Sequence, residues 1–151
     1  MYHLFKGHQI YQIMIRSIRI TKVEGSNEGV PKGVNINIDV KIKKDEKGKE
    51  IITGNDITFT FTWTATYSDT GAPYIRMNGE VIASYENADE IVKNWAKKEP
   101  NYDVVNEIIQ AVNQVCSVGA VFVSDVLRMP PPLPSLIPPI TKKTAKTKKE
   151  G

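Results

Sequence analysis

The chain has few of the side chains that usually carry out chemistry. Cys116 is its single cysteine, and its two histidines, His3 and His8, both lie near the N-terminus. A single cysteine excludes an internal disulfide, a cysteine zinc site and a CxxC redox pair. A buried structural thiol is the favoured interpretation of Cys116, because free cysteine is among the most buried residue types.

Motifs of nucleotide-binding and zinc enzymes are also missing. The sequence contains no GxxxxGK[ST], no GxGxxG after a predicted strand and no HExxH. The acidic pair Asp89 and Glu90 could ligate a metal, but the first turn of a helix already explains it through the helix dipole. We therefore expect no catalytic residues, no metal and no cofactor, and an enzyme is disfavoured.

Long apolar runs and a strong charge bias are absent as well. The longest stretch without a polar side chain, residues 118–123, is too short to span a membrane. Residues 1–15 make a poor secretory signal because polar residues interrupt them. The net charge is +3, but the last ten residues carry five lysines and one glutamate, so the rest is close to neutral. We expect a cytoplasmic protein with neither membrane insertion nor nucleic acid as a partner.

Four stretches show the alternation of β-strands. They are residues 9–23, with an irregularity near Met14, then 34–42, 57–67 and 74–85. Met14 is also a candidate for the true start of the chain. The third stretch alternates aromatic and aliphatic residues with five threonines, which suits a half-buried strand. It contains no basic residue, so a core face is favoured over a stacking platform for nucleic acid.

Two helices are predicted after the strands, because the apolar spacing changes from two to three and four. Asn87 is the candidate N-cap of the first, which ends before Pro100. Asn101 is the candidate N-cap of a longer helix that runs to Leu127. From residue 115 onward apolar side chains surround nearly its whole circumference, which indicates burial on more than one side.

These elements predict an α+β fold: a four-stranded antiparallel sheet, a meander of long strands, followed by two helices packed on one face. The 151 residues suffice for one domain, which we place at residues 1–140. A second copy of the chain would cover the outer side of the second helix and give a dimer or tetramer. The alternative is that the proline-rich segment folds back over this side.

The segment after the second helix contains six prolines between residues 130 and 139. Prolines at this density favour an extended chain. We interpret residues 129–140 as an extended strap whose apolar side chains, Leu133, Leu136 and Ile137, dock on the body. The alternative is a polyproline ligand for another protein. Residues 141–151 are predicted to be a disordered, lysine-rich tail.

Several local strings occur in an order that resembles the SecB export chaperones and the SecB-like proteins. The strings are INIDVKI at residues 36–42, GEVIASY at 79–85, the dipeptide Pro100-Asn101, the helix to Leu127, and PPPLPSLIP at 130–138. The resemblance covers about residues 15–140. It implies a SecB-like fold.

The resemblance also implies a function. Members of the family are ATP-independent holdases, tetramers built as dimers of dimers, which keep unfolded or pre-secretory polypeptides soluble in hydrophobic grooves. Some SecB-like members serve toxin–antitoxin pairs, so a chaperone specific for one antitoxin is an alternative, and an oligomeric scaffold for one folded partner is another. The client contacts that the resemblance implies are Val34, Ile36, Ile38, Trp63, Met77, Trp95 and Phe122.

Overall fold

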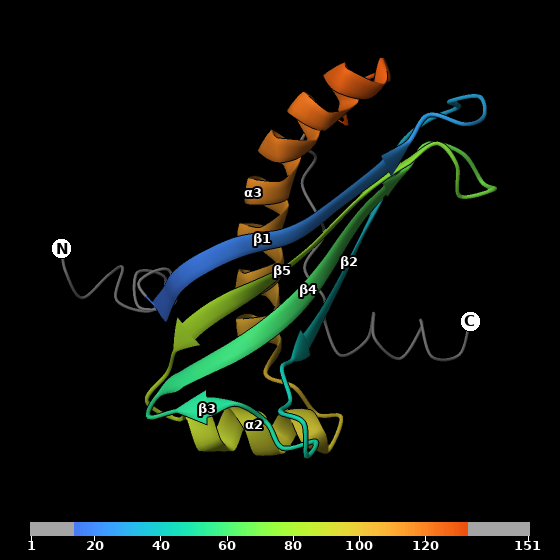
Figure 1. Cartoon of the computed structure of the whole chain (residues 1–151). Helices are drawn as coiled ribbons and strands as arrows, with labels where there is room; N and C mark the ends of the chain where they lie inside the picture. The colour runs from blue at the N-terminus through green and yellow to red at the C-terminus, as the bar shows by residue number, and fades with distance from the viewer. Residues whose placement is uncertain (1–13, 133–151) are drawn as a thin grey trace, which may run out of the picture.

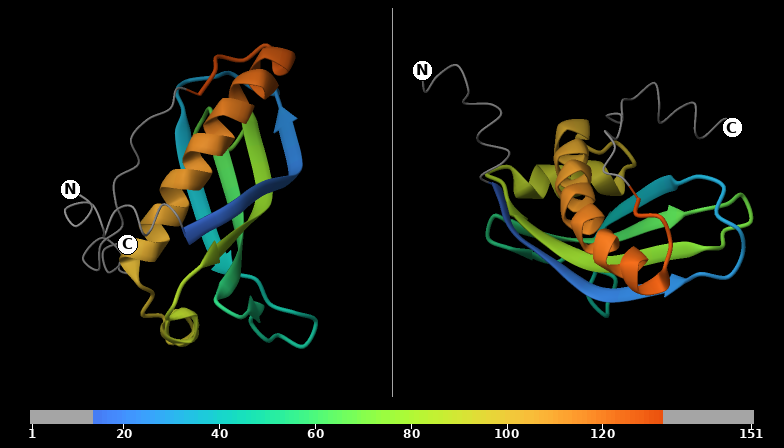
Figure 2. Two further views of the ribbon diagram at one scale, coloured as in Figure 1. Left: turned by 90° about the vertical axis from the view of Figure 1, so that its left-hand side faces the viewer. Right: turned by 90° about the horizontal axis from the view of Figure 1, so that it is seen from above.

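The computed structural model describes residues 14–132 and shows a curved antiparallel sheet with two helices on its concave side (Figures 1 and 2). The predicted fold class is thereby confirmed. In chain order the elements are β1 (Ile15–Ser26), β2 (Asn35–Ile42), the short β3 (Ile52–Thr53), β4 (Asp56–Thr66), β5 (Tyr74–Ser84), α2 (Ala88–Ala96) and α3 (Tyr102–Leu127).

The strand order differs from a simple meander. It is β1-β5-β4-β2, with β3 also paired to β4, and all pairings are antiparallel. The meander holds for β2, β4 and β5, whereas β1 lies beside β5 at the opposite edge. Residues 27–34 therefore carry the chain from one edge of the sheet to the other (Figure 1). Alternation alone could not predict this order, because it identifies strands but not their partners.

The two central strands divide the sheet into an apolar and a polar face. The alternate residues of β4 and β5 from Ile57 to Ala83 are buried, while the threonines between them lie on the outer face. Glu80 sits in the middle of this polar face, where its carboxylate contacts Lys43 at 2.7 Å and Arg19 at 3.7 Å. The outer face can thus meet water, which agrees with the half-buried strand that the five threonines predicted.

Two register shifts explain why β1 alternates only partly. They lie between Ile15 and Ser17 and between Ile20 and Lys22. Each shift inserts one extra residue, so that the isoleucines stay on the inner face although their spacing is not strictly two. The irregularity expected near Met14 therefore lies inside the strand, and residues 9–13 of the predicted strand are outside the described residues.

Helix α3 crosses the concave face diagonally, from β2 near its first turn to β1 near its last (Figure 2). Asn101 caps it as predicted, accepting hydrogen bonds from the backbone N–H groups of Asp103 and Val104. Asn87 does stand at the N-cap of α2, but its side chain makes no capping hydrogen bond. A short helix whose inner residues are buried depends more on packing than on its cap.

By length and composition alone α3 could cross a membrane, in contrast to the expectation from unbroken apolar runs. The difference arises because single polar residues interrupt the helix without lowering its mean hydropathy far. Ten of its 26 residues are buried in the fold, including Val104, Ile108, Val112 and Ala120, so its length and composition are weak evidence for a membrane span.

A buried polar contact joins α3 to the centre of the sheet. The indole N–H of Trp63 donates a hydrogen bond to Asn113 Oδ1 at 3.1 Å, and the Ser117 hydroxyl lies 3.3 Å from the same oxygen. Further along the helix, Gly119 faces Met77, whose Cε would lie 3.3 Å from an added Cβ. Near Asn113 and Gly119 the helix is therefore hydrogen-bonded to the sheet and packs closely against it.

The C-terminal end of α3 is held by two hydrogen bonds to distant loops. Asn27 Nδ2 donates to the carbonyl of Leu127 at 2.8 Å, and the Tyr67 hydroxyl donates to the carbonyl of Pro130, also at 2.8 Å. Met129 is buried in the core. The chain thus starts to turn over the sheet at residues 129–132, while the rest of the predicted strap and the tail lie outside the described residues.

Replacing Asn113 with alanine should destabilise the protein by about 1–3 kcal/mol, because the Trp63 indole N–H would remain buried without its acceptor. Urea denaturation followed by circular dichroism measures this change. Asn101→Ala, which removes only an exposed cap, should cost about 1 kcal/mol. If Asn113→Ala lowered the free energy of unfolding by no more than the experimental error, the contact would not hold the helix on the sheet.

Candidate polypeptide-binding surface

The outer side of α3 carries apolar side chains with nothing packed on them among the described residues. Val118, Phe122 and Val126 are 64%, 70% and 79% exposed, and Val115 and Val121 flank them. Residues three and four positions apart share one face of a helix, so these side chains form one row, which we call the outer row. The sequence predicted that apolar residues encircle this half of the helix, and the structure shows which of them remain open.

Glu107 lies three helical turns before Val118 on the same face of α3. Both its carboxylate oxygens are buried, and neither has a hydrogen-bond partner within residues 14–132. Burial raises the pKa of Glu107 to about 7. No pattern in the sequence marked this residue, since a glutamate in an amphipathic helix usually indicates a solvated face.

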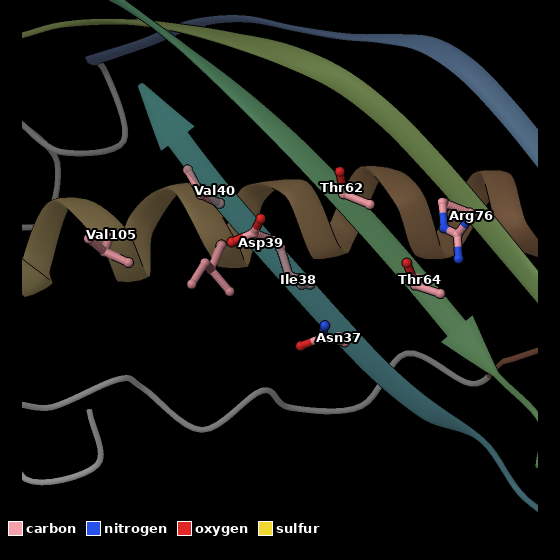
Figure 3. A pocket seen from close by; sticks show the side chains of 9 residues that line it. Asn37, Ile38, Asp39, Val40, Thr62, Thr64, Arg76 and Val105 are labelled. Carbon is pink, nitrogen blue, oxygen red and sulfur yellow. The ribbon is translucent and has the colours of Figure 1, made fainter. Parts of the chain in front are cut away.

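A hollow of about 580 Å³ lies where β2, at the edge of the sheet, meets the first half of α3 (Figure 3). Its apolar lining comes from Ile38 and Val40 of β2 and from Val105 and Ile109 of α3. Its polar lining comes from the outer face of the sheet, namely Asn37, Asp39, Thr62, Thr64 and Arg76. Within the described residues β2 pairs only with β4, so its other edge is free to accept an extended chain.

The seven predicted client contacts lie in three different settings. Ile38, Trp63 and Met77 are opposite one another on neighbouring strands, but the last two are fully buried beneath α3. Trp95 is half-buried on α2, with its ring 5.5 Å from that of Phe59. The remaining positions are exposed or half-buried: Val34 lies just before β2, Ile36 and Ile38 lie on β2, and Phe122 lies on α3.

The structure does not bring these seven residues together as one surface, and their binding role stays a prediction. Trp63 and Met77 could contact a client only if α3 moved away. Sequence reasoning missed Val105 and Ile109, which line the hollow. Their helical spacing placed them on the packed face, and only the position of the helix over the sheet edge could show that they also border a hollow.

Catalytic chemistry finds little support in residues 14–132. No three acidic, histidine or cysteine side chains among them are grouped to hold a metal ion. Cys116 is fully buried, and burial raises the pKa of its thiol to about 12. The thiol is therefore protonated at neutral pH and is not poised as a nucleophile. His3 and His8 lie outside the described residues.

Comparison with known proteins relates the chain to others through its fold. No protein-family model matches the sequence, and no curated protein matches it. Among solved structures, the chain is similar to the Rv1957 SecB-like chaperone of Mycobacterium tuberculosis, solved in complex with a ChAD peptide from the Rv1956 HigA1 antitoxin. The TM-score is 0.51 at 12% identity, over 91% of this chain and 99% of that one.

A second structure, a protein of unknown function from Streptococcus agalactiae, matches with a TM-score of 0.43 at 4% identity, over 82% of this chain and 96% of that one. The first of the two similarities shows that the sheet and helices have a SecB-like arrangement. At 12% identity it concerns the fold alone.

Cys116 should react with a thiol reagent only after unfolding. At pH 8 the native protein should show almost no labelling, because the sulfur is buried and its pKa is raised to about 12. The same protein in concentrated urea should label completely, which serves as the control. Fast labelling of the native protein, with a midpoint below pH 8, would contradict the inert thiol and revive an enzymatic role.

Glu107 should make stability depend on pH between its unfolded and folded pKa values, 4.5 and about 7. Because the folded-state pKa is the higher one, the contribution of Glu107 to the free energy of unfolding is fully present below pH 4.5. This contribution is lost as the pH rises from 4.5 to about 7. Glu107→Gln should therefore raise the melting temperature at pH 8 but not at pH 4. Equal shifts at both pH values would show that the carboxyl group is not desolvated.

Proposed function

We propose that this protein is an ATP-independent chaperone of the holdase type, a homo-oligomer that binds unfolded or pre-secretory polypeptide segments. The observation that carries the proposal is the pairing of an open apolar row on α3 with a hollow of mixed polar and apolar lining, beside an edge of β2 that has no strand partner within residues 14–132. A holdase needs accessible apolar surface and no catalytic group. The SecB-like fold supports the same function.

The outer row is best suited to bind a second copy of the chain. Its side chains are large, contiguous and apolar, and soluble monomers rarely expose such a patch. Two copies related by a two-fold axis would bury their outer rows against each other. Helices would then lie in the middle of the assembly with the polar sheet faces outside, and a dimer of dimers would follow from a further contact.

The hollow beside β2 is suited to bind the client. Its volume of about 580 Å³ falls in the range of ordinary ligand pockets. An extended segment could pair with the free edge of β2 and place alternate side chains against Ile38 and Val40. Backbone pairing does not depend on the client's side chains, so this mode of binding allows many clients. Pockets that recognise particular side chains would instead favour one antitoxin.

The binding of antitoxin peptide by the M. tuberculosis chaperone favours a narrower version, in which the client is one specific protein. A scaffold that binds one folded partner is the remaining alternative. The three differ in what they bind: many unfolded chains, one unfolded segment, or a folded surface.

Native mass spectrometry with lysozyme, folded or reduced and alkylated so that it stays unfolded, tests the proposal. We expect an oligomer that takes up unfolded but not folded lysozyme. Phe122→Lys should reduce the oligomer to a smaller species, because a charge would be buried in the contact. Ile38→Thr should keep the oligomer and weaken client uptake about threefold to tenfold, since part of the apolar lining is lost.

Ser17→Lys, on the exposed outer face of β1, is the matched control for the added charge and should change neither property. A wild-type protein that binds neither form of lysozyme would overturn the general holdase. A monomeric wild-type protein would overturn the role of the outer row, whether or not it binds the client.

A further inference from the structure

A second hollow, of about 590 Å³, is lined by the end of β2 and by α2. Figure 1 shows that these two elements lie near each other. The second hollow lies next to the hollow described above, which we call the client hollow. Strand β2 contributes residues 37–40 to the client hollow and residues 41 and 42 to the second hollow. Most of its exposed lining is apolar and comes from Val92, Trp95 and Ala96 of α2 and from Ile42. Trp95 is half-buried and can offer one side of its ring to a ligand.

The lining of this hollow also includes four lysines and a single carboxylate. The lysines are Lys41, Lys43, Lys44 and Lys98, and the carboxylate belongs to Glu50. Glu80 pairs with Lys43 at 2.7 Å, and Asp39 lies 3.8 Å from Lys41. The ion pairs found within residues 14–132 include neither Lys44 nor Lys98.

The backbone fixes where Lys98 stands. Its φ of 63° is left-handed, and its N–H donates to the carbonyl of Trp95 at 3.0 Å, so it closes the end of α2. Lys44 is held by its backbone bridge to Glu50, in the segment that follows β2. Two exposed lysines on different segments of ordered backbone thus line the hollow.

We propose that this hollow binds an acidic peptide segment that carries one aromatic or large aliphatic residue. The apolar residue packs against Trp95 and Val92, and the flanking carboxylates meet Lys44 and Lys98. The chain's own C-terminal tail does not fit, because its five lysines would be repelled. This would be a second site, selective for negative charge, and it does not depend on whether the client hollow binds a client.

A protein segment fits this hollow better than a nucleic acid does. Single-stranded nucleic acid is bound by a track of cations with several aromatic platforms. Here one tryptophan stands among aliphatic side chains, and Lys43 is already neutralised by Glu80. A small apolar surface lined also by Lys44 and Lys98 matches one apolar side chain between carboxylates.

Fluorescence anisotropy with the labelled peptide DEDEFEDED tests the proposal on the full-length protein. We expect binding that weakens as salt rises from low to physiological concentration. The amide analogue NQNQFQNQN should bind at least about tenfold more weakly, and DEDEAEDED, which lacks the aromatic residue, should also bind more weakly. Equal binding of the acidic and amide peptides would overturn the proposal.

The double variant Lys44→Gln and Lys98→Asn should weaken binding of DEDEFEDED about fivefold. Asparagine at residue 98 removes the charge and still tolerates the left-handed backbone. The control variant Lys22→Gln and Lys32→Gln removes two exposed charges outside the hollow and should leave affinity unchanged. A similar loss in both double variants would show that only net charge matters and would overturn the site.

Two further measurements distinguish this site from the client hollow and from a nucleic-acid site. Phe122→Lys and Ile38→Thr, which test the holdase function, should retain the affinity for DEDEFEDED. If they abolish it, the peptide is bound as an ordinary client and the separate site is wrong. Competition by a thymidine oligonucleotide as effective as that by the unlabelled peptide would identify a nucleic-acid site instead and would overturn the proposal.

Discussion

The position of α3 on the sheet depends on one buried polar contact. Apolar packing alone would let a helix slide or rotate over an apolar sheet face, because hydrophobic contact has no direction. The hydrogen bond from the Trp63 indole to Asn113 has a fixed geometry and a high cost if left unmade. It therefore selects one register of helix over strand, and Gly119 allows the close approach that this register requires.

The direction of the helix follows from this anchor together with its two ends. Asn101 caps the first turn, and Val105 and Ile109 of the first half lie beside β2. The bond from Asn27 to Leu127 holds the last turn near β1. Where the first half of the helix meets β2, at the edge of the sheet, the hollow lies between them. The side of the helix that faces away from the sheet carries the outer row.

Much of this fold could be predicted from the sequence, because strands β2, β4 and β5 have a strict period of two and α3 has a clear cap. The position of β1 could not, because its two bulges break the pattern and its partner lies far along the chain. The sequence did indicate the outer row, because apolar residues surround the helix from residue 115 onward. It did not indicate the two hollows, since each joins residues of a helix to residues of a distant strand.

The placement of β1 at the edge beside β5 has a consequence for folding during synthesis. β1 leaves the ribosome first, but β5, its partner, is made only after β2, β3 and β4. The later strands pair with near neighbours and lose little chain entropy on closing their loops, while β1 must wait for a distant one. Until then its isoleucines are exposed on an unpaired strand, so the nascent chain passes through a stage in which it is itself prone to aggregate.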